Sequence, residues 1–427
     1  MIVTVSPSTI SGKIKAPPSK SSMQRACAAA LLTPGTSVID NFGNSNDEQA
    51  ALDIISKLGA VINKVNNKLA ISSSDYIFKS AFSEKNLLVN CGESGLSMRM
   101  FAPIAALFNY DITFTGEGSI LKRPMNFFDE HFPALGVQIN SNSGKLPITI
   151  HGPLQPKNIT VNGSMSSQFL TGLLFAYAKA CMAPVSIKVE NLLSRPYIDL
   201  TISVLRHFGF QVSNENYETF TLYPREPLQS HSIKYKVEGD WSNAAFLLVA
   251  GAVSGEIILT GNDLNSSQGD KNIMEALYDC GAEIHINKDE INIKRNNLDA
   301  FNFDATHCPD LFPPLVVLAA YCKGTSTIKG VNRLLHKESN RAVTLRDEFK
   351  KMNVDIDLNG DVMTIKGSKE IRGAKVSSHN DHRIAMACAI AALGAKGNTS
   401  IQNAEAVKKS YPDFFKDLKQ LKAGVKN

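Results

Sequence analysis

The sequence predicts an α/β (α+β) protein of two lobes, each made of three βαβαββ repeats with buried parallel helices inside and sheets outside. Three observations predict this fold. A segment formed by an amphipathic helix and two short apolar strands recurs along the chain, and a nearly all-apolar helix lies between successive copies. The chain also has 427 residues, which is more than one ordinary core accommodates.

The recurring segment has the same order of parts in each copy: helix, apolar residue, turn residue, strand, polar turn, strand. The clear copies are residues 53–72, 131–150, 204–223, 276–293 and 349–365. In each copy the helix ends at a residue type that accepts the left-handed conformation. These residues are Gly59, Gly136, Gly209, Gly281 and Asn353, at spacings of 77, 73, 72 and 72 residues.

A sixth copy is cut short at the end of the chain. Gly424 follows Asn353 by 71 residues, and the chain stops before the strands of this copy. We expect the apolar strand in residues 1–7 to complete it, which would place both termini in one lobe. The predicted lobes are therefore residues 1–18 with 239–427, and residues 19–238.

Six other segments are rich in Ala and apolar nearly all round, which predicts buried helices. They are residues 22–32, 96–108, 166–180, 241–253, 310–322 and 381–393. A helix that is apolar on every side belongs at the centre of a lobe, so the sheets are expected to lie outside these helices.

The composition excludes several classes of protein. A net charge of +5 suits small anionic ligands and is too weak and dispersed to indicate nucleic acid. The longest apolar runs are about half the length of a membrane span, and the first residues, MIVTVSPST, lack the regions of a signal peptide. The seven scattered cysteines predict neither disulfides nor zinc, so we expect a cytoplasmic protein, and we favour a monomer.

Polar residues collect at the expected start of each buried helix. Such starts carry unpaired N–H groups and the positive end of the helix dipole, so they bind anions. If the parallel helices of a lobe begin at one surface, two such surfaces should face each other across an interlobe cleft, the expected active site. The residues are Ser19, Lys20, Ser21 and Arg25; Glu93, Ser94, Gly95 and Arg99; Ser166, Ser167 and Gln168; Asp240, Trp241 and Ser242; Asp310; and Asn380, Asp381, His382 and Arg383.

A second set of polar residues follows the strand after each buried helix, and it is mostly basic. Arg matches the planar geometry of carboxylate and phosphate, and Lys supplies a mobile point charge. Recurrence at equivalent places in several repeats indicates a shared anion site. The set comprises Asp47, Arg123, Arg195 with Tyr197, Lys337 with Glu338 and Arg341, and Lys409.

Each residue also has a structural alternative. Ser166 to Gln168, Asp240 and Asp310 are residue types that cap helices. Lys337 and Glu338 could form a solvated surface pair, and a histidine such as His382 more often lies in a core than in a catalytic site. Only the recurrence of these residues at one end of the repeats favours a functional site.

Ten short motifs, in this order, resemble those of the 5-enolpyruvylshikimate-3-phosphate synthases, and the resemblance covers essentially the whole chain. GSMSSQFLT and NDHRIAM are the most specific. The motifs are SKSSMQR, GESGLSMR, LKRPM, GSMSSQFLTGLL, SRPYID, EGDWS, PDLFPP, HKESNR, NDHRIAM and KKSYPDFF.

The resemblance implies a fold of two lobes, each of three βαβαββ units, that closes on two anionic substrates. The residues it assigns to shikimate-3-phosphate are Lys20, Ser21, Arg25, Ser166, Ser167, Gln168, Ser194, Tyr197, Asp310 and Lys337. Those it assigns to phosphoenolpyruvate are Lys20, Gly95, Arg99, Arg123, Gln168, Arg341, Arg383 and Lys409.

The implied reaction moves an enolpyruvyl group from phosphoenolpyruvate to the 5-hydroxyl of shikimate-3-phosphate through a tetrahedral intermediate, a step of aromatic amino-acid biosynthesis. It needs a group that adds a proton to a methylene carbon and later removes one. We assign Glu338 to that carbon, Asp310 to the attacking hydroxyl and Lys20 to the departing phosphate. The carboxylates are not clustered at metal-ligand spacing and no nucleotide-binding Gly-rich loop is present, so we expect no metal and no organic cofactor.

Three residues depart from the pattern of this family. Leu96 stands where Thr is common, Asn340 where Asp is usual, and Glu93 where Asn is common. Leu96 bears on the shape of the implied phosphoenolpyruvate pocket and on inhibitor (glyphosate) response.

Three other functions stay open. A related enolpyruvyl transferase acting on UDP-N-acetylglucosamine should carry a nucleophilic Cys on a loop and lack SSQFLT. A non-catalytic anion-binding protein would need the cations but not Glu338 with Asp310. RNA 3'-phosphate cyclases have related repeats but need nucleotide-binding features that this sequence lacks.

Overall fold

The computed structural model describes residues 1–78, 86–226, 232–367 and 370–426. The chain divides into two compact units. Unit 1 consists of Met1–Pro17 with Glu238–Asn427, and unit 2 is Pro18–Val237. Each unit has a continuous apolar core of its own, as expected for segments that fold around separate centres.

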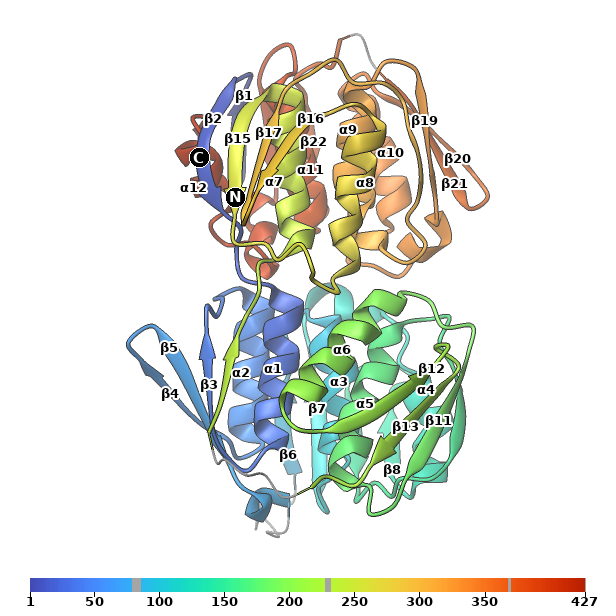
Figure 1. The fold of residues 1–427 in the computed structure, drawn as a ribbon. Helices are drawn as coiled ribbons and strands as arrows, with labels where there is room; N and C mark the ends of the chain where they lie inside the picture. The colour runs from blue at the N-terminus through green and yellow to red at the C-terminus, as the bar shows by residue number, and fades with distance from the viewer. Residues whose placement is uncertain (79–85, 227–231, 368–369, 427) are drawn as a thin grey trace. The chain divides into compact units, whose positions relative to one another are not determined.

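Three long apolar helices form the centre of each unit (Figure 1). Their composition explains this position, because every residue of the last of them, His382–Leu393, is buried. In unit 2 the central helices are α1 (Lys20–Leu32), α3 (Gly95–Ala105) and α5 (Ser167–Ala180). In unit 1 they are α7 (Trp241–Ser254), α9 (Phe312–Tyr321) and α11 (His382–Leu393). All six predicted buried helices are confirmed.

A second, amphipathic helix follows in each repeat. These helices are α2 (Asn46–Lys57), α4 (Phe127–His131), α6 (Arg195–His207), α8 (Ile273–Asp279), α10 (Arg341–Lys351) and α12 (Phe414–Gln420). Short 3-10 helices are η1 (Asp75–Phe78), η2 (Gly118–Lys122), η3 (Pro133–Leu135), η4 (Gly269–Asn272), η5 (Pro309–Leu311), η6 (Val331–Leu334) and η7 (Ala404–Lys409).

The predicted turn residues adopt the left-handed conformation in five of the six repeats. Their φ angles are +102° at Gly59, +79° at Gly136, +80° at Gly209, +79° at Gly281 and +65° at Asn353.

The sixth assignment, Gly424, is wrong. Lys422 has the positive φ of 69° in the sixth repeat, and Gly424 begins the next strand. Two hydrogen bonds that end α12, from Lys422 N to Lys419 O and from Ala423 N to Leu418 O, both at 2.9 Å, accompany this conformation, although the residue there is not the Gly or Asn that usually signals it.

Six four-stranded sheets cover the central helices in the described part of the chain. In unit 2 their strand orders are β14 (Ser232–Lys236)–β3 (Gly35–Asp40)–β5 (Lys68–Ser73)–β4 (Val61–Val65), β6 (Asn86–Asn90)–β7 (Asp111–Thr115)–β9 (Ile148–His151)–β8 (Gln138–Ser141), and β10 (Ile159–Asn162)–β11 (Val185–Glu190)–β13 (Thr219–Tyr223)–β12 (Gln211–Glu215).

The sheets of unit 1 follow the same plan. Their strand orders are β16 (Glu283–Asn287)–β17 (Glu290–Lys294)–β15 (Gly255–Thr260)–β2 (Ile10–Lys15), β18 (Asn302–Asp304)–β19 (Thr325–Lys329)–β21 (Val362–Lys366)–β20 (Asp355–Asn359), and β22 (Lys375–Ser377)–β23 (Thr399–Gln402)–β1 (Ile2–Ser6)–β24 (Gly424–Lys426).

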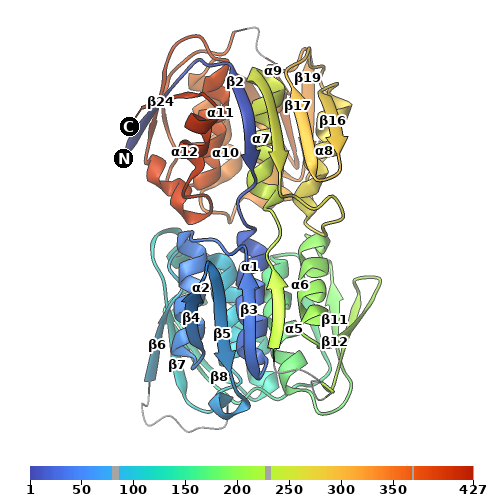
Figure 2. The ribbon, with the colours of Figure 1, turned by 60° about the vertical axis from the view of Figure 1, so that its left-hand side comes forward.

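Two strands pair in the unit that does not contain the helix following them, with partners that the sequence analysis did not predict. Strand β2 precedes α1 of unit 2 but pairs in parallel with β15 of unit 1. Strand β14 precedes α7 of unit 1 but pairs in parallel with β3 of unit 2. Figure 2 shows both exchanged strands beside their new partners.

The first strand of the chain joins the sheet of the last repeat, where it lies between two strands and pairs antiparallel with both. This strand, β1, is the element that the shortened sixth repeat lacked. The amino group of Met1 also pairs with Glu405 at 2.7 Å.

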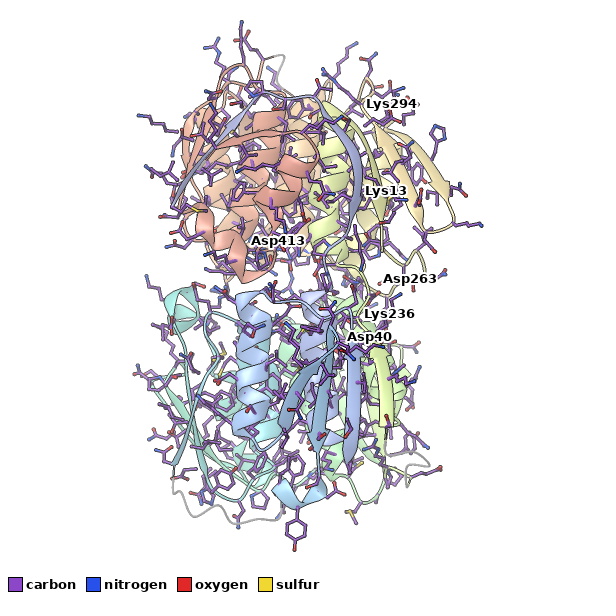
Figure 3. All side chains as sticks on the ribbon, turned by 90° about the vertical axis from the view of Figure 1, so that its left-hand side faces the viewer. Lys13, Asp40, Lys236, Asp263, Lys294 and Asp413 are labelled. Carbon is purple, nitrogen blue, oxygen red and sulfur yellow. The ribbon has the colours of Figure 1, made fainter. Side chains whose placement is uncertain are left out.

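Charged side chains cover the outside of the sheets. Figure 3 shows Lys13 and Lys294 at the surface of unit 1, on β2 and β17. Among the described residues, no helix is both long enough and apolar enough to cross a membrane.

Candidate active site

The central helices of unit 2 begin at serines whose side chains accept backbone hydrogen bonds. Ser19 accepts from Ser22 N, Ser94 from Ser97 N and Ser166 from Gln168 N. Ser166 therefore does cap α5, as its structural alternative expected. Capping does not exclude ligand binding at the same helix start.

Buried Gln24 of α1 forms hydrogen bonds with the starts of α2 and α3 in unit 2. Its Nε2 lies 3.0 Å from Asp47 O, 2.9 Å from Ser94 Oγ and 2.8 Å from Ser97 Oγ. These contacts join α1, α2 and the start of α3, so the helix starts that the repeats predicted to be equivalent do meet in space.

Two guanidinium groups gather at the start of α3. Arg99 Nη1 donates to Gln168 Oε1 on α5 at 2.9 Å, and the Arg99 guanidinium lies over the ring of Phe169 at 5.0 Å. A Cβ atom on Gly95 would lie 2.7 Å from Arg123 Nη1 and 3.2 Å from Arg99 Nη1. The absence of a side chain at Gly95 thus lets both cations approach the start of the helix, an arrangement whose charge and N–H donors suit an anion.

Glu93 organises the turn that supplies Arg123. Its carboxylate accepts from Ser119 N at 3.1 Å, while Arg123 Nη2 donates to Ser119 Oγ at 3.2 Å. This departure from the family pattern therefore has a local role, because it holds the segment of η2 that precedes Arg123. Leu96 is buried in the first turn of α3, next to Gly95.

Arg25 is buried in α1, where its guanidinium is held at three points. Nε donates to Thr201 Oγ1 at 2.9 Å, Nη1 to Ser21 O at 2.9 Å and Nη2 to Tyr197 O at 3.2 Å. Burial lowers the pKa of Arg25 to about 10, which still leaves it charged at neutral pH. These contacts bring Arg25, Ser21 and Tyr197 together. Ser194, with a φ of 57°, directly precedes α6, the helix that carries Tyr197.

Lys20 begins α1 and pairs with Asp47 of α2, with 2.7 Å between Nζ and Oδ2. Both side chains are largely shielded from solvent. The predicted site residues of unit 2 therefore all lie at the starts of α1, α3, α5 and α6 and in the turns beside them.

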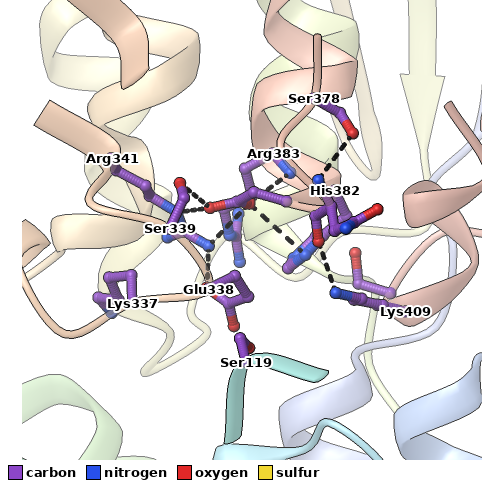
Figure 4. A network of polar contacts seen from close by, with 12 residues as sticks. Ser119, Lys337, Glu338, Ser339, Arg341, Ser378, His382, Arg383 and Lys409 are labelled. Carbon is purple, nitrogen blue, oxygen red and sulfur yellow. Dashed lines mark hydrogen bonds and ion pairs between the residues drawn. The ribbon is translucent and has the colours of Figure 1, made fainter. Parts of the chain in front are cut away.

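Unit 1 contains a second polar network, centred on Arg341 at the start of α10 (Figure 4). Its Nε donates to Asp381 Oδ2 at 2.8 Å, its Nη1 to Asp310 Oδ1 at 2.8 Å, and its Nη2 to Glu338. The guanidinium is only 1% exposed. One buried cation thus binds three carboxylates from separate segments. Because these hydrogen bonds join charged groups, they are strong and hold the arrangement rigid.

Asp310 lies among three cations. Besides Arg341, Lys337 Nζ lies 3.1 Å from Oδ1, and Arg383 Nη2 lies 3.2 Å from Oδ2. Burial favours the neutral acid, but Arg383, Lys337 and Arg341 outweigh it and hold the pKa of Asp310 well below its ordinary value. Burial lowers the pKa of Lys337, a loss that Asp310 partly offsets.

The structural alternatives for Asp310 and for the Lys337–Glu338 pair are wrong. Asp310 lies in η5 and no side chain caps α9, so it is not a helix cap. Lys337 and Glu338 are mostly shielded, and each pairs with a residue of the network. Asp240 does cap α7, accepting from Asn243 N at 2.8 Å.

Lys409 and Asn340 complete the unit 1 group. Lys409 Nζ donates to the carbonyl of Asn380, which lies two residues before buried His382. Asn340 caps α10 by accepting from Val343 N at 3.5 Å, a role that Asn and Asp fill equally well. This departure from the family pattern therefore leaves the start of α10 in place.

Sequence reasoning missed one buried carboxylate of this group, Asp270. Ser242 Oγ donates to Asp270, and burial, with the nearby charge of Asp310, raises the pKa of Asp270 to about 6. Asp270 occupies the fourth-repeat position that corresponds to Asp47 and Lys409 in other repeats. The same periodicity could therefore have found it.

The comparisons with known proteins agree on one family. The family model described as EPSP synthase (3-phosphoshikimate 1-carboxyvinyltransferase) matches residues 5–418. The chain belongs to the EPSP synthase family. Two curated relatives named 3-phosphoshikimate 1-carboxyvinyltransferase are similar to it over nearly their whole length. The one from Clostridium novyi (strain NT) is 36% identical over 423 residues (98% of this chain, 97% of the relative), and one from Clostridium perfringens is 37% identical over 420 residues (98% of each).

Two solved structures support the fold. An EPSP synthase from Acinetobacter baumannii matches with a TM-score of 0.81 and 26% identity over 100% of both chains. The enolpyruvyl transferase NikO from Streptomyces tendae, at 16% identity, shows the fold alone, with a TM-score of 0.76 over 100% of this chain and 98% of its own. The predicted α/β fold class and the predicted family are confirmed.

In the part of the chain that the structure describes, no group of three or more His, Cys, Asp or Glu side chains is placed to hold a metal ion. All seven cysteines fall within that part, and each is buried with a free thiol.

Proposed function

We propose that this chain transfers the enolpyruvyl group of phosphoenolpyruvate to the 5-hydroxyl of shikimate-3-phosphate and releases phosphate. Membership of the EPSP synthase family supports the reaction. The observation in the structure that carries it is the joint binding of Asp310 and Glu338 by Arg341. An anion-binding protein would need the cations of this site but not two carboxylates fixed side by side.

We assign the basic and polar side chains of the candidate site to the two substrates. Arg25, Ser21 and Tyr197 would hold shikimate-3-phosphate, together with Lys20, Ser166, Ser167, Gln168, Ser194, Asp310 and Lys337. Arg99 and Arg123 beside Gly95 would hold phosphoenolpyruvate, together with Lys20, Gln168, Arg341, Arg383 and Lys409. Their charges are fixed before the substrates arrive, so they stabilise developing charge without reorganisation.

The chemistry follows from the bonds that change. The 5-oxygen of shikimate-3-phosphate attacks carbon 2 of phosphoenolpyruvate as Asp310 takes the hydroxyl proton, and Glu338 delivers a proton to the methylene carbon. The resulting tetrahedral ketal then loses phosphate by cleavage of its carbon–oxygen bond, and Lys20 gives a proton to the departing oxygen. The proton that Asp310 took from the hydroxyl replaces the one lost by Lys20, so the hydroxyl proton leaves with the phosphate. Removal of a methyl proton by Glu338 restores the double bond.

Substrate binding would also make Asp310 a stronger base. Arg341, Arg383 and Lys337 hold the pKa of Asp310 low, so its carboxylate binds a proton poorly while all three stay on it. Arg341 and Arg383 are assigned to phosphoenolpyruvate and Lys337 to shikimate-3-phosphate. The negative charges of the two substrates would offset the field of these cations at the carboxylate without moving them, so the proton affinity of Asp310 would rise when both substrates are bound.

The wider assignments of the sequence analysis remain part of this proposal. Seven buried free thiols support a reducing compartment, so we place the protein in the cytoplasm, where the shikimate pathway would use it. We propose a monomer that needs no metal and no organic cofactor, acts on small anions, and uses neither nucleic acid nor a membrane.

The test is phosphate release from phosphoenolpyruvate with and without shikimate-3-phosphate, measured for the parent chain and for Asp310→Asn and Glu338→Gln. Release should require both substrates, and each variant should lose about 10²- to 10⁴-fold in kcat, the usual contribution of an acid–base group. Glu370→Gln is the matched control, because Glu370 pairs with Arg372 and Lys396 outside the network and should leave kcat unchanged. Near-normal kcat in both site variants would overturn the assignment.

A further inference from the structure

The loop before α11 has an unusual backbone. His379 and Asn380 are consecutive residues with positive φ angles, 51° and 57°. Asn66 with Asn67 and Asn216 with Tyr217 also have two positive φ angles in succession, but they lie in hairpin turns, which favour this conformation. The pair before α11 joins a strand to a helix, so its conformation depends on the contacts around it. The residues that follow are Asp381, which binds Arg341, and Arg383, which binds Asp310.

Two sets of contacts hold this loop. Ser378 Oγ accepts from Asn380 N at 3.1 Å and donates to Asn403 O at 2.8 Å, and two other loop residues bind Glu348, a buried carboxylate near the end of α10. Ser377 N donates to its Oε2 at 2.9 Å, and His379 Nε2 lies 2.8 Å from its Oε1. Lys351 Nζ contacts both oxygens, at 2.8 and 2.7 Å. An ionised carboxylate only accepts hydrogen bonds, so the Nε2 of His379 must carry the hydrogen.

The charge state of Glu348 agrees with this geometry. Burial favours its neutral form, but hydrogen bonds from Lys351, His379 and Ser377 outweigh burial and lower its pKa. The carboxylate is therefore ionised at neutral pH and ready to accept from both loop residues.

Helix α10 contacts the loop at two separated points. Arg341, its first residue, binds Asp381, and Glu348, about two turns later, binds Ser377 and His379. A single contact would fix the position of the loop. Two contacts also fix its orientation, and with it the direction of the Asn380 carbonyl that accepts from Lys409.

We infer that Glu348 and His379 form a positioning pair that orients the loop carrying Asn380, Asp381 and Arg383 for the binding of phosphoenolpyruvate. This inference rests on the proposed function, which assigns Arg383, Arg341 and Lys409 to that substrate. Neither member of the pair touches the reacting atoms. The pair acts through the loop, so its loss should affect phosphoenolpyruvate more than shikimate-3-phosphate, whose main cation, Arg25, belongs to α1 of unit 2.

The test compares His379→Ala with His379→Gln. Both variants replace His by residues less suited to positive φ, but only Gln keeps an N–H donor that can reach Glu348. His379→Ala should raise KM for phosphoenolpyruvate about tenfold, the usual effect of losing a hydrogen bond to a charged group. KM for shikimate-3-phosphate should change less than about twofold, and His379→Gln should recover most of the loss.

His151→Ala is the matched control. His151 also pairs with a carboxylate, Asp111 at 2.6 Å, but it does so on a sheet of unit 2. It should leave both KM values unchanged. A KM for phosphoenolpyruvate unchanged in His379→Ala, or raised equally in His379→Gln, overturns the inference, and so does an equal rise of both KM values with a lower melting temperature.

Amide hydrogen exchange separates this inference from the proposed function. Residues 378–383 should exchange faster in His379→Ala than in the parent chain, and His379→Gln should restore slow exchange. A parent chain that releases no phosphate with both substrates would refute the proposed function, while exchange would still report on the pair. Unchanged exchange in His379→Ala would refute the positioning role whatever the activity.

Discussion

Gly95→Ala is the substitution that most directly probes the proposed phosphoenolpyruvate-binding residues of unit 2. The added methyl group would lie 2.7 Å from Arg123 Nη1, 3.2 Å from Arg99 Nη1 and 3.5 Å from Gln168 Oε1. Such short contacts must be relieved by movement. The atoms that must move are the ends of flexible side chains, so the helix can stay in place while the two guanidinium groups are pushed from the start of α3.

The expected effects on stability and on binding therefore differ. Gly95 does not have a positive φ, so Ala fits its backbone, and the smaller entropy of the unfolded chain should stabilise the fold by up to about 1 kcal/mol. Displacing a charge-assisted hydrogen bond to the substrate should cost about 1.5–3 kcal/mol, which raises KM for phosphoenolpyruvate roughly 10- to 100-fold.

The assay is the initial rate of phosphate release with phosphoenolpyruvate varied at saturating shikimate-3-phosphate, together with thermal unfolding. Gly172→Ala in α5 provides the contrast, because its Cβ would meet the backbone of α3, 2.5 Å from Arg99 O. That variant should lose about 1–3 kcal/mol of stability through overpacking. The reasoning is refuted if Gly95→Ala leaves KM within about twofold of the parent value, or if it destabilises the fold more than Gly172→Ala does.

Three further predictions follow from buried groups. Arg25→Lys keeps the charge but cannot reproduce the three-point contact, so KM for shikimate-3-phosphate should rise about tenfold or more; an unchanged KM would count against this role. Burial and the charge of Asp310 raise the pKa of Asp270 to about 6, so the folded state favours the neutral acid. The contribution of Asp270 to the free energy of unfolding is therefore complete below its unfolded pKa and is lost as pH rises through about 6. Asp270→Asn should therefore be more stable than the parent at pH 8 by up to about 3 kcal/mol, a gain that shrinks toward pH 4; a gain independent of pH, measured by thermal unfolding, would contradict this. Since all seven thiols are buried, N-ethylmaleimide at pH 7 should leave most of the activity, whereas rapid inactivation would favour an enzyme with a nucleophilic cysteine.

The central helices could be predicted from the sequence because their composition leaves no face for solvent. The segment 241–253 is apolar nearly all round, and α7 (Trp241–Ser254) is accordingly buried. The positions of candidate residues near the starts of such helices, such as Arg99 and Arg383, could also be predicted, because the repeat places them at equivalent positions.

The features that could not be predicted depend on tertiary structure. The pairing of β2 with β15 joins strands far apart in the chain, and the alternation of apolar residues does not specify a parallel partner. Lys422 takes the left-handed position although Gly424 is the better residue type, because α12 ends at Gln420 and closes with hydrogen bonds from Lys422 N and Ala423 N. The contact between Arg25 and Thr201 also has no signal in the sequence, since either residue alone is ordinary in a helix.

One isotope experiment tests the central claim, that this chain transfers an enolpyruvyl group by addition and elimination at carbon. Phosphoenolpyruvate labelled with ¹⁸O in its carbon–oxygen–phosphorus bridge is incubated with shikimate-3-phosphate and the enzyme, and the products are examined by mass spectrometry. Cleavage of the carbon–oxygen bond, as proposed for the tetrahedral intermediate, predicts that the label leaves in phosphate. Label retained in pyruvate or in the transferred group would mean cleavage at phosphorus and would contradict the proposed reaction.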